Sequence, residues 1–290
     1  MTRAAPGKDG LLELELLPDG PGHRFVRAPL SLGRILHADP QARNAQVVYI
    51  RATGGGLAQG DRVQQHISVR SGAHAVVTSQ TATRIHSMNG GYASQESHLH
   101  VASGAVLEYL PDPIIPSRDC DFRQRTQVQV APGATAIVGD CFTAGRTAHG
   151  EFHDAARIDL RAELSIGAPP AAPEVASVPT FIERASYRGK SQLSAPVTHG
   201  SYRAWANLWV VCDSSLRDEV LAAWRDYPTR STEIVVGASS FPEGSASGTS
   251  GCWARCMGQR IEDIAAWQWD YWDRARRIVL GVSAFDLRKM

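Results

Sequence analysis

Four carboxylates in or beside alternating polar and apolar stretches are the clearest candidates for chemistry in this chain: Glu108, Asp112, Asp140 and Glu151. Paired carboxylates can act as general acid and base or hold a hard cation. Carboxylates on strands are also commonly no more than solvated side chains. Two of the four are harder to dismiss, because Glu108 interrupts an apolar run and Asp112 lies between two prolines that fix its backbone.

A run rich in hydroxyls and amides, Thr-Ser-Gln-Thr-Ala-Thr-Arg at residues 78–84, directly follows an apolar stretch. The side chains of Thr78, Gln80 and Thr83 either form a polar exit from a strand or line a hydrophilic wall. No Gly-x-Ser-x-Gly elbow or other nucleophile motif accompanies them.

The glycine-rich segment 54–61, Gly-Gly-Gly-Leu-Ala-Gln-Gly-Asp, invites comparison with a phosphate-binding loop. Such a loop needs Lys-Ser/Thr after its last glycine, whereas Asp61 and Arg62 follow here. The segment also leads into a strand, so no helix N-terminus faces an anion. We predict no nucleotide binding, and expect a turn that contacts another protein through Gly54, Gly55, Gly56 and Asp61.

Histidines form two local clusters, which invite a metal-binding interpretation. His98 and His100 fall on one face of an expected strand, and His149 and His153 flank Glu151. Such clusters can bind Ni²⁺ or Zn²⁺, but no Cys/His quartet accompanies them. We therefore expect no fixed metal site and no tightly bound cofactor.

The elements around these residues follow one repeated plan. Alternating runs at 64–69, 97–101 and 125–130 each end in Val, and after two intervening residues Gly-Ala opens a second run. Alternation has the period of a β-strand, and the glycines at 72, 104 and 133 supply turns. The pattern predicts a mainly β fold of stacked antiparallel hairpins, solenoid-like or sandwich-like.

Two helices are expected in the last third of the chain, at about 215–226 and 261–280. Ser214 and Ser215 are suited to cap the first. In the second, Trp267 and Trp269 lie at the edges of the apolar stripe, which suggests that a partner covers them. The Ser/Gly-rich stretch 237–251 between the helices is expected to be mobile.

We expect one domain over residues 1–290, with the hairpin core at 11–167 and strands plus the two helices at 174–290. A Pro/Ala-rich break at 168–173 separates these parts.

Composition narrows the functional classes. The formal net charge is +1, with 30 basic and 29 acidic residues, so nothing attracts nucleic acid or an anionic membrane in bulk. No apolar segment has the length of a membrane span or of a signal peptide core. Five irregularly spaced cysteines suggest reduced thiols. We expect a cytoplasmic protein.

Several of these segments, in this order, resemble the family of the urease accessory protein UreD, also called UreH. The shared motifs are the glycine loop at 54–61, the hydroxyl-rich run at 78–84, Gly-Ala-Val-Leu-Glu-Tyr-Leu-Pro at 104–111, and Gly-Arg-Thr-Ala-His-Gly-Glu at 145–151. A weaker match is the helix ending in Ile-Val-Leu-Gly at 278–281. Gln59 departs from the family pattern, which has glycine at that position.

The resemblance implies a non-enzymatic chaperone for nickel insertion into urease. Its implied partners are apo-urease and an assembly of UreF with the GTPase UreG, and its implied cargo is transient Ni²⁺ in an internal polar passage. For that passage we expect weak oxygen ligands from Glu108, Asp112, Asp140 and Glu151, lined by Thr78, Gln80 and Thr83. Arg146, in the last strong motif, joins the partner-contact candidates.

A second hypothesis is a carbohydrate-active β-solenoid hydrolase. It would use Glu108 together with Asp112 or Asp140 as its paired carboxylates.

Overall fold

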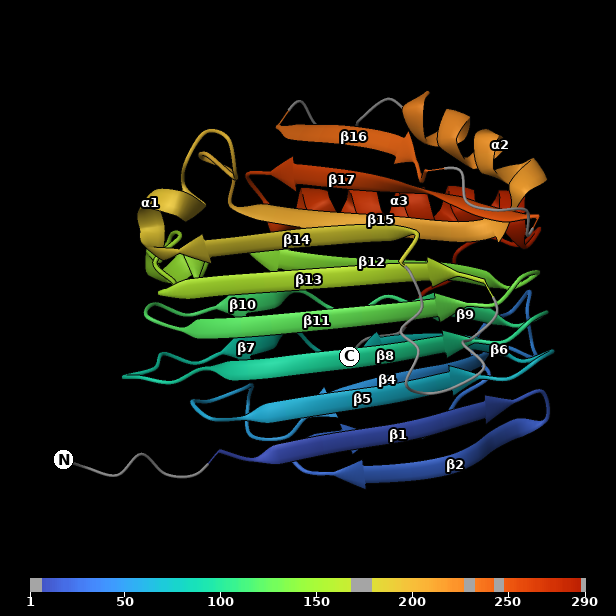
Figure 1. Cartoon of the computed structure of the whole chain (residues 1–290), viewed down its shortest axis with the longest axis horizontal. Helices are drawn as coiled ribbons and strands as arrows, with labels where there is room; N and C mark the ends of the chain where they lie inside the picture. The colour runs from blue at the N-terminus through green and yellow to red at the C-terminus, as the bar shows by residue number, and fades with distance from the viewer. Residues whose placement is uncertain (1–6, 168–178, 227–232, 243–247, 288–290) are drawn as a thin grey trace.

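The computed structural model describes residues 7–167, 179–226, 233–242 and 248–287, which form two long sheets stacked face to face (Figure 1). Sheet A, in front in Figure 1, has the strand order β14 (Phe181–Arg188), β13 (Arg157–Ile166), β11 (Asp121–Val130), β8 (Ala93–Val101), β5 (Arg62–Val69), β1 (Asp9–Leu17) and β2 (Gly20–Arg27). Sheet B has the order β16 (Ile234–Ser240), β17 (Thr249–Gly258), β15 (Ala204–Asp213), β12 (Thr135–Thr143), β9 (Val106–Tyr109), β6 (His74–Ser79), β4 (Gln46–Ala52) and β3 (Leu30–Leu32). Two short strands, β7 (Thr83–Ile85) and β10 (Ile114–Pro116), extend sheet B beside β12.

The repeated turns occupy equivalent places, as their spacing predicts. Gly72, Gly104 and Gly133 have φ of 78°, 69° and 73°, a left-handed conformation that glycine adopts at little cost. The amide of Gly72 donates to the Gly104 carbonyl at 3.3 Å, and that of Gly104 donates to the Gly133 carbonyl at 3.1 Å. The turns therefore stack directly on one another.

The mainly β, stacked, solenoid-like architecture is confirmed, but the antiparallel hairpins are a wrong prediction for the repeated core. At each glycine turn the chain crosses from sheet A to sheet B, so the two runs of a repeat face each other across the core. Each run instead pairs in parallel with its equivalent in the next repeat, β5 with β8 and β11, and β6 with β9 and β12. Alternation has the same period in both arrangements and does not distinguish them. Antiparallel pairs occur toward the ends of the sheets, as between β1 and β2 or β15 and β17.

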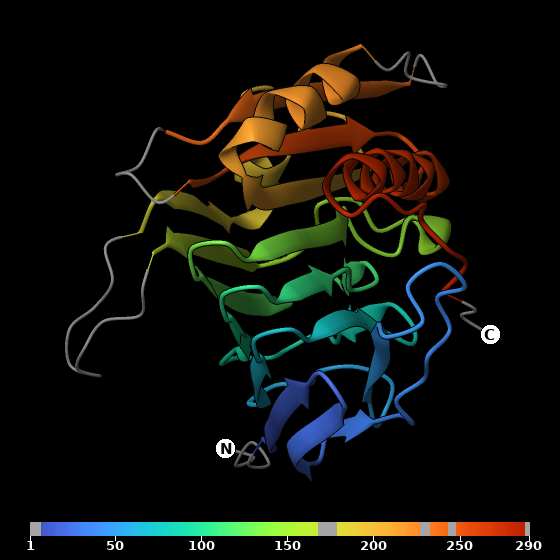
Figure 2. The ribbon, with the colours of Figure 1, turned by 90° about the vertical axis from the view of Figure 1, so that its right-hand side faces the viewer.

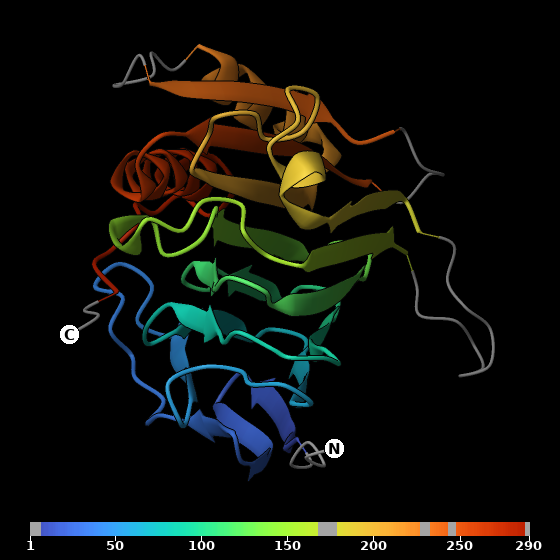
Figure 3. The same ribbon diagram turned by 90° about the vertical axis from the view of Figure 1, so that its left-hand side faces the viewer.

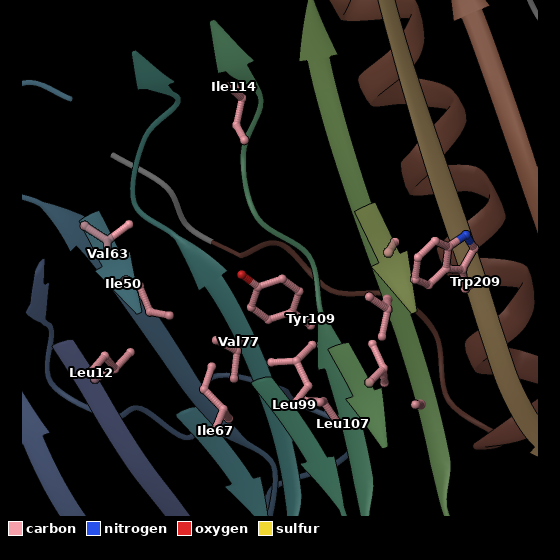
Figure 4. Packing of buried hydrophobic residues seen from close by; sticks show 14 of the residues in the cluster. Leu12, Ile50, Val63, Ile67, Val77, Leu99, Leu107, Tyr109, Ile114 and Trp209 are labelled. Carbon is pink, nitrogen blue, oxygen red and sulfur yellow. The ribbon is translucent and has the colours of Figure 1, made fainter. Parts of the chain in front are cut away.

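The main core fills the space between the sheets. Ile67 and Leu99 of sheet A pack with Leu107 and Tyr109 of sheet B (Figure 4). These side chains are almost fully buried. In β5 and β8 the residues that face this core alternate with residues that face away from it.

Helices α2 (Ser214–Arg225) and α3 (Ile261–Val279) cover the outer face of sheet B and form a second core there, as Figure 2 shows. Both predicted helices are thus present. The cap of α2 differs from the prediction, since Asp213 is the N-cap and its Oδ1 accepts from the Ser215 amide at 2.9 Å. No helix among the described residues is long and apolar enough to span a membrane.

In the Ser/Gly-rich stretch predicted to be mobile, most of the described residues are strand. Residues 237–240 belong to β16 and 249–251 to β17, while 243–247 lie outside the described residues. The predicted break at 168–173 also lies outside them. One turn of helix, α1 (Gly189–Leu193), and a 3₁₀ turn, η1 (Thr147–His149), lie in loops at the strand ends that face the viewer in Figure 3.

Candidate functional site

A band of polar side chains crosses the inner face of sheet A, between rows of core residues. Strand register places Gln65, Ser97, Thr126 and Glu183 in one row. Polar groups inside a core are costly unless they are hydrogen-bonded or hydrated. The band therefore marks a part of the interior that is built for polar contents.

Sheet B faces this band with a row of its own. Asp140 on β12, Asn207 on β15 and Arg255 on β17 lie in register. Asp140 Oδ1 accepts from the Asn207 amide at 3.2 Å and from Asn207 Nδ2 at 2.9 Å. Asn207 Oδ1 in turn accepts from Arg255 Nε at 2.8 Å, and Arg255 Nη2 donates to Glu183 of sheet A. The row thus links the two sheets through a continuous polar chain.

Asp140 has an unusual electrostatic environment. Burial raises its pKa to about 6, although Arg255 and the hydrogen bonds from Asn207 act in the opposite direction. Its direct hydrogen-bond partner is neutral Asn207, whereas Arg255 meets it only through that amide. At neutral pH the carboxylate therefore carries a charge that its direct partner does not neutralise, and this favours a cation beside it.

Three cavities follow the band and share walls. The largest, about 190 Å³, is bordered by Gly55, Gly56 and the hydroxyl-rich run, and it extends to Gln95 and Tyr109. Gln95 and Tyr109 also border the second cavity, of about 30 Å³, which reaches Asp140 and Asn207. Those two residues border the third, of about 20 Å³. Spaces of this size hold one or a few waters each, so the band is a discontinuous polar passage.

Tyr109 lies between the first two cavities. Its hydroxyl donates to Gln65 Oε1 at 3.3 Å and lies 3.4 Å from Ser97 Oγ. Burial raises the pKa of this phenol, which keeps it neutral. Its hydroxyl and the amide of Gln65 give the passage a neutral lining at this point.

The hydroxyl-rich run divides into lining and structural residues. Thr83 borders the first two cavities, and Asp112 borders the second, where its Oδ2 accepts from Ser79 Oγ at 3.1 Å. Thr78 borders the first, but its hydroxyl donates to the Leu110 carbonyl at 2.6 Å. Gln80 is half-buried in the loop after β6 and is not among the residues that border these three cavities.

Glu108 does not belong to the passage, contrary to the prediction. Tyr109 points between the sheets, so its neighbour Glu108 points to the outer face of sheet B, beneath α3. There the fully buried carboxylate accepts from His74 Nε2 at 2.7 Å and from Trp272 Nε1 at 2.5 Å, and Arg276 Nε lies 3.1 Å away. Arg276 also pairs with Asp39 at 2.5 Å, which ties the end of α3 to the loop before β4.

This placement also argues against the hydrolase hypothesis. Glu108 and Asp140 lie on opposite faces of sheet B, so they do not flank one substrate. Glu108 is in addition fully enclosed by its partners.

Glu151 and Arg146 pair with each other in the loop after β12. Arg146 Nε donates to Glu151 Oε2 at 2.9 Å, and a second bond joins Nη2 to Oε1. The hydrogen bond from Arg146 lowers the pKa of Glu151. The structure does not bring Glu151 to the three cavities, and the guanidinium of Arg146 is already engaged within the chain.

The glycine loop is exposed at Gly54 and Gly55, as a contact surface requires, whereas Gly56 and Asp61 are buried. A Cβ on Gly56 would lie 2.0 Å from the Arg84 carbonyl, so only glycine fits there. Asp61 accepts from the amides of Lys8 and Ala58, each at 2.8 Å. Asp61 therefore holds the loop rather than meeting a partner, which corrects that prediction.

The two tryptophans of α3 also differ. Trp267 is 3% exposed and packs in the second core, so it is not available to a partner. Trp269 is 40% exposed and makes an edge contact with Trp272. Only Trp269 remains a contact candidate.

Comparison with known proteins decides the family. The model of the UreD urease accessory protein family matches residues 18–289, nearly the whole chain. The chain belongs to the UreD family.

Relatives with the UreD name come from distant organisms. A urease accessory protein UreD 2 of Streptomyces griseus is 42% identical over 173 residues, which is 58% of each chain. UreD of Haloarcula marismortui is 40% identical over 151 residues, 51% of this chain and 50% of the relative. UreD of Yersinia pseudotuberculosis is 31% identical over 230 residues, 77% and 69% respectively. The chain thus spans only about half the length of the first two of these UreD proteins.

The resemblance to UreD motifs did not point to several residues of the passage. Gln65, Gln95 and Gln124 fall in runs where both faces of the strand carry polar side chains, so alternation does not reveal which face is inside. Asn207 and Arg255 lie in β15 and β17, and the sequence did not predict which strands pair with these two. A single Asn inside the apolar run 204–212 is the one signal that could have indicated a buried polar site.

Proposed function

We propose that this chain is a non-catalytic maturation factor for urease, which passes Ni²⁺ along the polar band between its two sheets. Membership of the UreD family supports the urease context. The observation that carries the transport role is the series of cavities bordered by Asp112, Tyr109 and Asp140.

The chemistry of the lining suits passage rather than storage. Carboxylate, amide and hydroxyl oxygens are hard ligands, and Ni²⁺ prefers imidazole nitrogen to them. Along most of the band the ion therefore keeps water and exchanges quickly. Asp140 supplies the negative charge that draws a cation inward, because its direct partner Asn207 is neutral.

The partners in this proposal are apo-urease and UreF, with the GTPase UreG joined through UreF. Gly54 and Gly55 are exposed, and Gly55 borders the 190 Å³ cavity, so this loop offers one contact surface, and Trp269 offers another. In this proposal nucleotide hydrolysis belongs to UreG, and Asp61, which follows the glycines of this chain, holds its own loop through the amides of Lys8 and Ala58.

The test is co-expression of urease and its accessory proteins with Asp140→Asn, and with Asp19→Asn in an exposed turn as the matched control. We expect Asp140→Asn to assemble with UreF and apo-urease normally but to give urease with clearly less nickel, measured by metal analysis of the purified enzyme. The Asp19→Asn control should load fully. Equal nickel in both would contradict the passage, and failure to co-purify with UreF and apo-urease would contradict the scaffold role.

A further inference from the structure

Two buried histidines lie at one end of the polar passage. His153 follows η1, and His199 lies in the loop between α1 and β15. Both loops are at the strand ends that face the viewer in Figure 3. They are 1% and 6% exposed, and their ring centroids are 5.7 Å apart. His199 borders the third cavity together with Asp140 and Asn207. The pair is thus adjacent to the proposed route of the ion.

A backbone carbonyl fixes the tautomer of His153. Its Nε2 lies 3.1 Å from the Tyr202 carbonyl, which only accepts, so Nε2 carries the proton. The Nδ1 atoms of His153 and His199 are both buried and have no hydrogen-bond partner. The His153 ring therefore keeps a bare lone pair on Nδ1 inside the protein, next to a second imidazole whose Nδ1 is also unpartnered.

This arrangement is unusual for structural histidines. A buried polar atom without a hydrogen-bond partner lowers the stability of the fold. His153 also has φ of 54°, which is uncommon for a residue other than glycine. This backbone conformation further lowers the stability of the folded state. Metal-binding histidines typically donate their second ring N–H to a carbonyl or carboxylate, and His153 is held in that way.

We propose that His153 and His199 form a two-imidazole binding site for Ni²⁺, or a similar borderline divalent cation, at the end of the polar passage. The proposal rests on the proposed function only in naming nickel as the cargo. Imidazole nitrogen binds nickel more strongly than the oxygen ligands along the band, so the ion would collect at this pair. The separation of the rings is roughly that of two imidazoles on one ion, with nitrogen–metal distances of about 2 Å.

The site would bind reversibly, because the chain supplies only two ligands. The described residues contain no group of three or more His, Cys, Asp or Glu side chains arranged to hold a metal. Water in the adjoining 20 Å³ cavity would complete the coordination. Burial keeps both rings ready to bind, since it lowers the pKa of His199 to about 4 and also lowers that of His153.

A second pair of histidines provides a matched control. His66 and His98 lie on the outer face of sheet A, with ring centroids 4.7 Å apart and planes only 2° from parallel. The lone pairs of stacked parallel rings point along separate planes and do not converge on one ion. Both rings are also partly solvent-exposed.

The experiment titrates the purified full chain with Ni²⁺ by calorimetry and with Co²⁺ by visible absorption. The variants are His153→Asn, since Asn tolerates positive φ, and His199→Phe, which keeps the aromatic contacts with Trp205 and Tyr187. We expect each to weaken binding at least about tenfold and to remove the nitrogen-ligand Co²⁺ bands. The double variant His66→Ala/His98→Ala should bind as the parent does.

Unchanged Ni²⁺ affinity and Co²⁺ spectra in His199→Phe, with a native circular dichroism spectrum, would overturn the proposal. If a variant fails to fold, His199→Gln gives a second test, because it replaces the imidazole and its nitrogens by a smaller polar group. Failure here is distinguishable from failure of the passage, because urease nickel loading with Asp140→Asn is measured separately. Loss of binding in both histidine variants, with the control pair unaffected, supports the site.

Discussion

Two carboxylates on neighbouring strands of sheet B show how differently one sheet uses its two faces. Glu108 lies beneath α3, where a guanidinium, an imidazole and an indole N–H surround it. Asp140 lies between the sheets, where its direct partner is a neutral amide and cavities border it. The first carboxylate fastens a helix to the sheet. The second retains charge and acceptor capacity that the fold itself does not use.

Replacing each carboxylate by its amide should therefore have opposite consequences, and the larger effect belongs to Glu108→Gln. The change removes one of the two carboxylates that pair with buried Arg276 and leaves Asp39 as the other. Breaking a buried ion pair in this way costs about 3–5 kcal/mol in the free energy of unfolding. Urea denaturation measures this loss. The control is Arg277→Gln on the same helix, whose exposed pair with Asp273 is worth less than about 1 kcal/mol. Equal stability of Glu108→Gln and the parent would refute the anchoring role.

Asp140→Asn should stabilise the protein at neutral pH. The pKa of Asp140 rises from 3.8 to about 6 on folding, so the folded state binds more protons between these values. Stability from this group is present below pH 4 and is lost as the pH rises to 6. Since water in the cavities screens the charge, we expect a gain of about 1–2 kcal/mol at pH 7 and none near pH 4.

Urea denaturation of the parent and Asp140→Asn at both pH values checks this. If the variant is as unstable at pH 7 as Glu108→Gln, the two carboxylates have the same structural role and the comparison fails.

The smallest loss of stability is expected for Trp269, which lies at the exposed edge of α3. Trp269→Ala removes a half-exposed ring and its edge contact with Trp272, which costs about 1 kcal/mol. Trp267→Ala, in the second core, should cost about 3–5 kcal/mol. Thermal unfolding separates the two. If Trp269 meets a partner, Trp269→Ala should also weaken UreF binding, and unchanged binding would remove this contact from the proposal.

The sequence predicted local features with a short-range cause. Positive φ at Gly72, Gly104 and Gly133 follows from glycine placed between alternating runs. The apolar stripe and the stop at Gly281 place α3 to within a residue of its observed end. It did not predict β16, because small and polar residues in 237–251 carry no strand pattern, and their strand state depends on pairing with β17.

The candidate site was partly predictable, because some of its residues have distinctive neighbours in the sequence. Asp112, Asp140 and Thr83 were proposed from their neighbours in the sequence, and all three border the cavities. Glu108 came from an equally strong motif but faces the other way. Alternation fixes that Glu108 and Tyr109 point to opposite faces, and it does not say which face is the interior.

The sequence by itself thus determined the strands of the repeated core, the repeated turns, the two helices and the membership of a family, because each depends on residues close together in the chain. The tertiary structure decided the parallel pairing, the side on which α3 packs and the meeting of Asp140, Asn207, Arg255 and Glu183. Residues 24 to 115 positions apart come together there. Such contacts depend on which strands lie side by side in the sheets, and the local periodicity of the sequence does not specify the strand order.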